Sequence, residues 1–166
     1  MMEELLHSLW AGAALWTLLY ISDYALTLCC ARIYHAGVKD KIVFEGSFEL
    51  TPYYQDDIDA LRTVSRRFIF ALLLSLVLLF SLWWVGTEPY SFALGAMILV
   101  ELTVHIRHLQ NFFLFRTILT TDEVSGRIEY SRPLMLRQSS IEILMFGVMF
   151  TLVFAYTPSW FLLGGA

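Results

Sequence analysis

The stretch FIFALLLSLVLLFSLWWV, from Phe68 to Val85, decides the fold of this chain. It contains no ionisable residue, and about 20 helical residues are what a bilayer core of ~30 Å requires. The whole chain has 166 residues, of which 58% are hydrophobic and 16% charged. Ordinary soluble domains are about 45–50% apolar and about 25% charged. A soluble fold of this size cannot enclose so much apolar surface, so the sequence predicts an integral membrane protein.

Three further segments have the length and hydropathy of a membrane span. They are residues 8–31, 91–115 and 141–163, and with 68–85 they make four predicted transmembrane helices. The fold class predicted is therefore an all-α polytopic membrane protein, with the lipid bilayer as its surroundings. Long connections at 32–67 and 116–140 separate the spans of each pair.

The basic residues predict the orientation of these spans. Of the 11 Lys and Arg, six lie in 32–67 and four in 116–140, while Arg107 lies at the same end of the third span. Because cytoplasmic loops carry the excess of Lys and Arg, the two long connections are expected in the cytoplasm and both termini outside. The expected location is a multi-pass position in the cell (inner) membrane. The net charge of −4 gives no basic surface for nucleic acid, which is excluded as a partner.

The two long connections contain similar motifs. One reads GSFELTP over residues 46–52, and the other reads GRIEYSRP over residues 126–133. This similarity predicts two tandem hairpin repeats, residues 1–87 and 88–166, each with a cytoplasmic strand followed by a helix that begins at proline. Strands are expected at 41–50 and 126–130, and their pairing would form a small β-containing cytoplasmic cap.

A few ionisable side chains lie near or within the spans, where charge is costly and commonly functional. Glu101, His105 and His108 recur at helical spacing and fall within an arc of about 60° on one face of the third span. Asp23 in the first span and Glu142 at the start of the fourth are expected at a similar depth. These five residues are therefore predicted to converge in the cytoplasmic half of the bundle: Asp23, Glu101, His105, His108 and Glu142.

The leading hypothesis is conduction or transport of protons or small cations by a homo-oligomer. Asp23 and Glu101 would be the central carboxylates and Glu142 the inner mouth. His105 and His108 would relay protons towards the cytoplasm, because histidine titrates near neutral pH.

Two other classes of protein remain open. Imidazole and carboxylate ligands suit iron, manganese or zinc, so a membrane-embedded redox or hydrolytic enzyme is the second hypothesis. Its metal ligands would come from His105, His108, Asp23 and Glu142. No catalytic residue is assigned, and apart from such a metal ion no cofactor is expected. The third hypothesis is an accessory or scaffold subunit of a membrane complex, in which these residues form interhelical hydrogen bonds.

Overall fold

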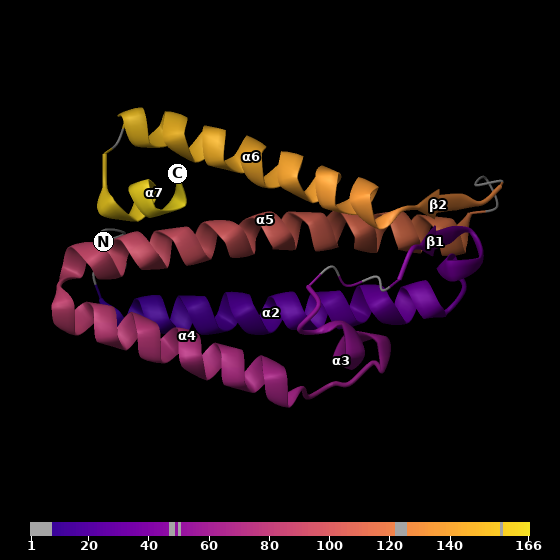
Figure 1. Ribbon diagram of the computed structural model, residues 1–166, viewed down its shortest axis with the longest axis horizontal. Coiled ribbons are helices and arrows are strands. Elements are labelled where there is room, and N and C mark those ends of the chain that lie inside the picture. Colours follow the sequence, from indigo (N-terminus) through magenta and orange to yellow (C-terminus); the bar gives the residue numbers. More distant parts are fainter. Residues whose placement is uncertain (1–7, 47–48, 50, 122–125, 157) are drawn as a thin grey trace.

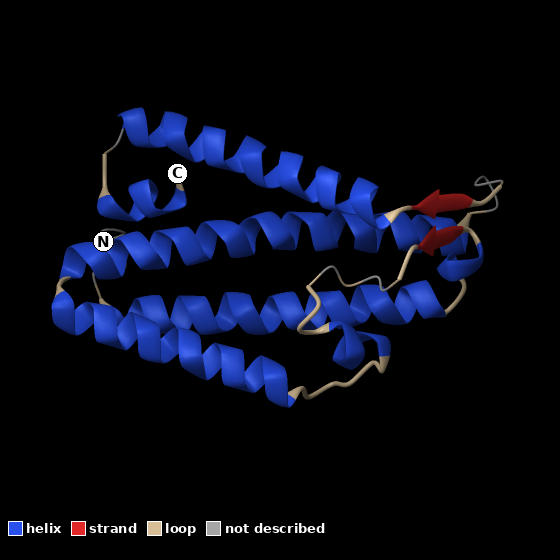
Figure 2. Cartoon of the chain, viewed as in Figure 1, coloured by secondary structure: helices blue, strands red, loops and turns tan. Residues whose placement is uncertain are grey.

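Four long helices dominate the computed structural model, which describes residues 8–46, 49, 51–121, 126–156 and 158–166 (Figures 1 and 2). All four are long and apolar enough to cross a membrane, and a two-stranded sheet accompanies them, as the sequence predicts. The long helices are α2 (Leu9–His35), α4 (Arg66–Val85), α5 (Thr87–Thr120) and α6 (Arg132–Tyr156). The shorter elements are η1 (Val38–Asp40), β1 (Ile42–Phe44), α3 (Gln55–Asp59), β2 (Ile128–Tyr130) and α7 (Trp160–Gly165).

Helix α5 is the centre of the arrangement, because α2, α4 and α7 all pack against it. The described chain begins and ends at the same end of the molecule as the α4–α5 turn, and the strands lie at the opposite end (Figure 1). We call these the terminus end and the loop end. A buried cluster of Trp16, Leu79, Tyr90, Leu94 and Ile98 fills the terminus end. This half of the bundle is therefore closed by apolar packing.

Helices α2 and α5 extend beyond the first residue of α4. At 1.5 Å per residue, the 20 residues of α4 cover about 30 Å and the 34 residues of α5 about 51 Å. The ring of Tyr24 on α2 lies 4.5 Å from that of Phe68, near the start of α4. The last eleven residues of α2, from Ala25 to His35, therefore project past α4 at the loop end.

The two strands join the two long connections. They pair in parallel, with Ile42 opposite Ile128 and Phe44 opposite Tyr130. Strand β1 precedes Gly46, whereas β2 follows Gly126, so the two similar motifs do not occupy matching places in this sheet. Residues 47, 48 and 50 of the first motif lie outside the described residues. The tandem repeat and its boundary between 87 and 88 stay predictions.

The connection into α4 differs from the single proline-started helix expected after Thr51. Helix α3 ends at Asp59, Leu61 takes a left-handed conformation (φ 51°), and α4 begins after Ser65. The Ser65 hydroxyl donates to the Asp57 carboxylate and also accepts from the backbone N–H of Phe68 at 3.1 Å. This hydroxyl fixes the N-terminus of α4 against α3.

The fourth span is the clearest correction to the sequence-based bounds of 141–163. Helix α6 begins earlier, at Arg132, and ends at Tyr156, and α7 is a separate short helix that packs against both α5 and α6 (Figure 1). Pro158 cannot donate a backbone hydrogen bond to continue a helix. Ser159 then caps α7 by accepting from the backbone N–H of Leu162 at 3.2 Å.

Glycine permits the close approach of α7 to α5. A Cβ at Gly95 would lie on the backbone carbonyl of Phe161, so no larger residue fits without a shift of the backbone. Gly147 on α6 faces only ordinary contact, because its nearest neighbour would be the carbonyl oxygen of Ala166 at 3.7 Å.

We therefore expect Gly95→Ala to separate α7 from α5 and to cost about 1–3 kcal/mol relative to Gly147→Ala, as overpacking does. Both substitutions share the helix-propensity gain of alanine over glycine, which cancels in the comparison. Thermal unfolding in detergent measures the difference. Equal stability of the two variants would contradict the packing of α7 described here.

A second prediction concerns acid stability. The hydrogen bond from Ser65, with help from Arg62 at 2.8 Å, holds the pKa of Asp57 below its ordinary value. A carboxyl whose folded pKa is depressed stabilises the fold fully above its unfolded pKa of about 4, and this contribution is lost as the pH falls further. We expect Asp57→Asn to be less stable at neutral pH and to lose less stability below about pH 4.

Unfolding temperatures measured across pH test this expectation. Asp56→Asn is the matched control, because the Asp56 side chain is 76% exposed. It should follow the parent protein over the whole pH range. Identical acid profiles for Asp57→Asn and the parent would refute the role of Asp57.

Candidate functional site

Three of the predicted residues meet between α2 and α5. One ligand atom each from Asp23, Glu101 and His105 lies within 4.8 Å of the other two. We call these three residues the carboxylate–histidine site. Asp23 is one residue before Tyr24, so the site lies at the level where α4 begins. The packing of two parallel helices thus brings together acids that are far apart in the sequence.

The His105 ring is held in place at both nitrogens. Its Nδ1 lies 2.8 Å from the carbonyl oxygen of Glu101, and its Nε2 lies 2.8 Å from the Ser22 hydroxyl. Because a carbonyl only accepts, Nδ1 carries a proton. The single hydrogen of Ser22 is directed at the carbonyl of Leu19, at 2.9 Å. In a neutral ring the Nε2 atom has a lone pair, which can accept from the Ser22 hydroxyl or bind a cation.

His108 lies close to both Asp23 and Thr27 of α2. Its Nε2 lies 3.0 Å from the hydroxyl of Thr27 and 3.5 Å from Oδ1 of Asp23. The Thr27 hydroxyl donates to the backbone carbonyl of Asp23 at 2.9 Å, so it accepts from His108. The Nε2–H of His108 therefore donates to Thr27, and Oδ1 of Asp23 lies near the same nitrogen without a hydrogen bond to a described residue.

Two carboxylate oxygens in this site are buried without a hydrogen bond to any described residue. They are Oδ1 of Asp23 and Oε1 of Glu101, and Glu101 as a whole is only 7% exposed. Buried carboxylates are costly unless a proton, a cation or hydrogen bonds compensate their charge. The site therefore has the capacity to bind a positive charge.

Glu142 lies apart from the other four predicted residues. Its Oε2 is 3.7 Å from Nε of Arg107, and its Oε1 accepts from the Gln138 amide at 3.2 Å. Arg107 also donates to Ser139 at 2.5 Å, so it ties α5 to α6. The predicted convergence of all five residues is wrong for Glu142, because Arg107 faces α6 whereas the carboxylate–histidine site faces α2.

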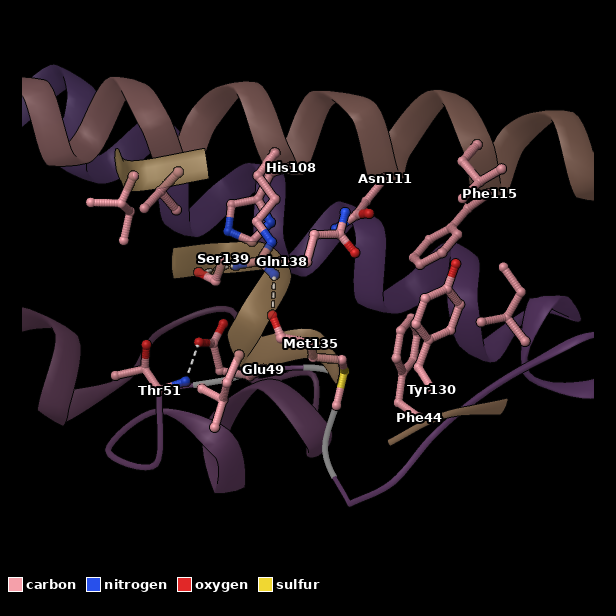
Figure 3. A pocket seen from close by; sticks show the side chains of 16 residues that line it. Phe44, Glu49, Thr51, His108, Asn111, Phe115, Tyr130, Met135, Gln138 and Ser139 are labelled. Carbon is pink, nitrogen blue, oxygen red and sulfur yellow. Dashed lines mark hydrogen bonds between the residues drawn. The ribbon is translucent and has the colours of Figure 1, made fainter. Parts of the chain in front are cut away.

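Two neighbouring cavities connect this site with the loop end. The smaller, about 170 Å³, is lined by Asp23, Glu101 and His108. The larger, about 400 Å³, lies between α5, α6 and the strands, and Figure 3 labels His108 and Gln138 among the residues that line it. His108, Glu49 and Thr51 line both cavities, so the two spaces adjoin at these residues.

Glu49 is a site residue that the sequence reasoning missed. It comes from the first long connection, and its Oε1 accepts from the backbone N–H of Thr51 at 2.7 Å (Figure 3). Burial raises the pKa of the Glu49 carboxyl, although its hydrogen bond with Thr51 acts in the opposite direction. The repeated motif was the available signal, but its counterpart Glu129 is 71% exposed and pairs with Arg127 at 3.2 Å.

Comparison with protein-family models, curated proteins and solved structures finds no match to this chain. The carboxylate–histidine site and the cavities beside it are therefore the features that bear on the function of this protein.

Proposed function

We propose that this protein spans a membrane four times and takes up protons or small cations at the carboxylate–histidine site for transport. The observation that carries the proposal is the buried Oε1 of Glu101, which has no hydrogen-bond partner among the described residues and lies beside Asp23. Two acids in one buried place favour a shared proton or a bound cation.

The level of the site in the membrane follows from α4. Its length of about 30 Å equals the thickness of a bilayer core, so its first residues, Arg66 and Arg67, belong at one membrane boundary. The concentration of Lys and Arg at the loop end supports a cytoplasmic placement of this boundary, with both termini outside. Asp23 then lies close to the cytoplasmic surface, and the strands project into the cytoplasm.

Access to the site supports uptake from the cytoplasmic side. The two cavities lead from the loop end to Asp23 and Glu101, whereas the Trp16 cluster fills the terminus end. Transport therefore requires a second conformation that opens the terminus end, as alternating access demands.

The residues take the following roles in this proposal. Asp23 and Glu101 bind the proton or cation, and His105 and His108 pass charge towards the cavities. Glu49, rather than Glu142, forms the inner mouth, because it lines both cavities.

A homo-oligomer remains part of the proposal. In the most apolar part of each helix, 0% of the residues of α6 and 6% of those of α4 are buried. Both helices therefore have faces that either lipid or another copy of the chain can cover. A second copy would enlarge the otherwise narrow bundle of four spans.

One observation favours a second candidate, a membrane-embedded metal-dependent enzyme. The larger cavity has a volume of about 400 Å³, within the range of pockets that hold small organic molecules. It adjoins the carboxylate–histidine site at His108, so a substrate there would lie next to a bound metal ion.

Flux measurements in proteoliposomes test the proposed transport. We expect Asp23→Asn and Glu101→Gln each to reduce proton or cation flux by about tenfold or more, because each removes a binding charge. Glu129→Gln is the matched control, since that acid is 71% exposed in the connection, and it should keep the parent flux. Parent-like flux in both site variants would reject the assigned roles.

A further inference from the structure

We propose that the carboxylate–histidine site binds a divalent first-row transition-metal ion through Asp23, Glu101 and Nε2 of His105. This inference deepens the proposed function and rests on it, because it names the class of cation that the site takes.

The donor atoms lie close to coordination distance. Metal–oxygen and metal–nitrogen bonds of about 2.1 Å place the donors of a tetrahedral ion about 3.4 Å apart, and donors on opposite sides of an ion about 4.2 Å apart. The three donors lie within 4.8 Å of one another, so small side-chain rotations bring them to one ion. They come from two helices that pack along their length, which makes the spacing a property of the fold.

The His105 ring has the orientation of a metal ligand. A ligating histidine usually donates its other ring N–H to a carbonyl or carboxylate, which fixes the ring and its tautomer. Here the Nδ1–H donates to the carbonyl of Glu101 at 2.8 Å, which leaves Nε2 as the ring nitrogen with a lone pair for a metal ion. The Ser22 hydroxyl beside Nε2 already has an acceptor in Leu19, so a metal ion can replace it without leaving it unpaired.

The balance of charge favours a divalent ion. Two carboxylates and a neutral imidazole carry two negative charges, which one divalent cation cancels within a buried site. Glu101, more than nine-tenths buried, directs an oxygen without a hydrogen-bond partner among the described residues into this place. Mixed imidazole and carboxylate donors suit zinc, iron or manganese, whereas magnesium and calcium prefer oxygen alone.

His108 and Thr27 lie next to the proposed ligand Asp23. Thr27 donates to the backbone carbonyl of Asp23 and contacts His108, whose Nε2 lies 3.5 Å from Oδ1 of Asp23. Three protein ligands leave coordination positions free for water or for a passing group, as in zinc sites that are not purely structural. The cavity of about 170 Å³ beside Asp23 and Glu101 gives room for them.

Metal binding to the purified full chain in detergent tests this inference without any activity assay. Zn²⁺ and Mn²⁺ should bind at one site per chain by calorimetry, and Mg²⁺ should not displace them. Glu101→Gln and His105→Ala should each weaken Zn²⁺ binding by about tenfold or more, as losses at metal sites do. His35→Ala is the matched control, because His35 is exposed at the end of α2, and it should bind like the parent.

Two further measurements guard against misfolded variants. Ser22→Ala removes only the hydroxyl that the metal replaces, so it should keep parent-like affinity. Co²⁺ should give visible absorption bands that depend on His105 and persist in Ser22→Ala. Absence of Zn²⁺ and Co²⁺ binding by the parent, or equal binding by His105→Ala and His35→Ala, would overturn the inference.

The two proposals fail in different ways. If Asp23→Asn and Glu101→Gln abolish proton flux while no divalent ion binds the parent, transport stands and the metal inference is wrong. If the metal binds as described while these variants keep parent flux, the metal site stands and transport is wrong.

Discussion

The burial of Asp23 and Glu101 between α2 and α5 is the constraint on which the rest of the structure depends. Each carboxylate has an oxygen without a hydrogen bond to the described residues, and both residues line the same small cavity. The nearby histidines offset part of this cost: a nitrogen of His105 lies within 4.8 Å of both acids, and Nε2 of His108 lies 3.5 Å from Oδ1 of Asp23. Under the proposed function a proton or cation completes the compensation, which would link binding to folding in this site.

The two ends of the bundle differ in a way that suits such a site. The terminus end is filled by aromatic and aliphatic side chains, and α7 packs there against Gly95 of α5. The loop end contains the strands, the cavities and Glu49. Among the described residues both cavities lie on the loop-end side of the carboxylates, which suits the proposed uptake of a cation from that end.

Much of this fold could be predicted from the sequence, because its signals are long and apolar. Phe68–Val85 alone requires a helix of bilayer length, and the Lys and Arg residues mark one end of all four long helices. Pairing of the two connections was also predicted from their similar residues. The break near Pro158 was missed, because residues on both sides of it are equally apolar and hydropathy does not register a helix that folds back.

The candidate site was predictable only in part. Helical spacing placed Glu101, His105 and His108 on one face, and matching depth brought Asp23 to them. The depth of a residue in the membrane could not place Glu142, because depth does not show which face of α5 meets α6. In the structure Glu142 pairs with Arg107 on that face. Glu49 was missed because it lies in an irregular connection, where no periodicity shows which side chain turns inwards.

The central claim is that Asp23 and Glu101 share one bound proton or cation. Infrared difference spectroscopy of the parent protein, before and after cation addition or a pH step, observes carboxyl groups directly. We expect one set of carboxyl bands that changes together and that disappears in both Asp23→Asn and Glu101→Gln. Bands of one acid that persist unchanged when the other is replaced would show two independent carboxylates and would contradict the account.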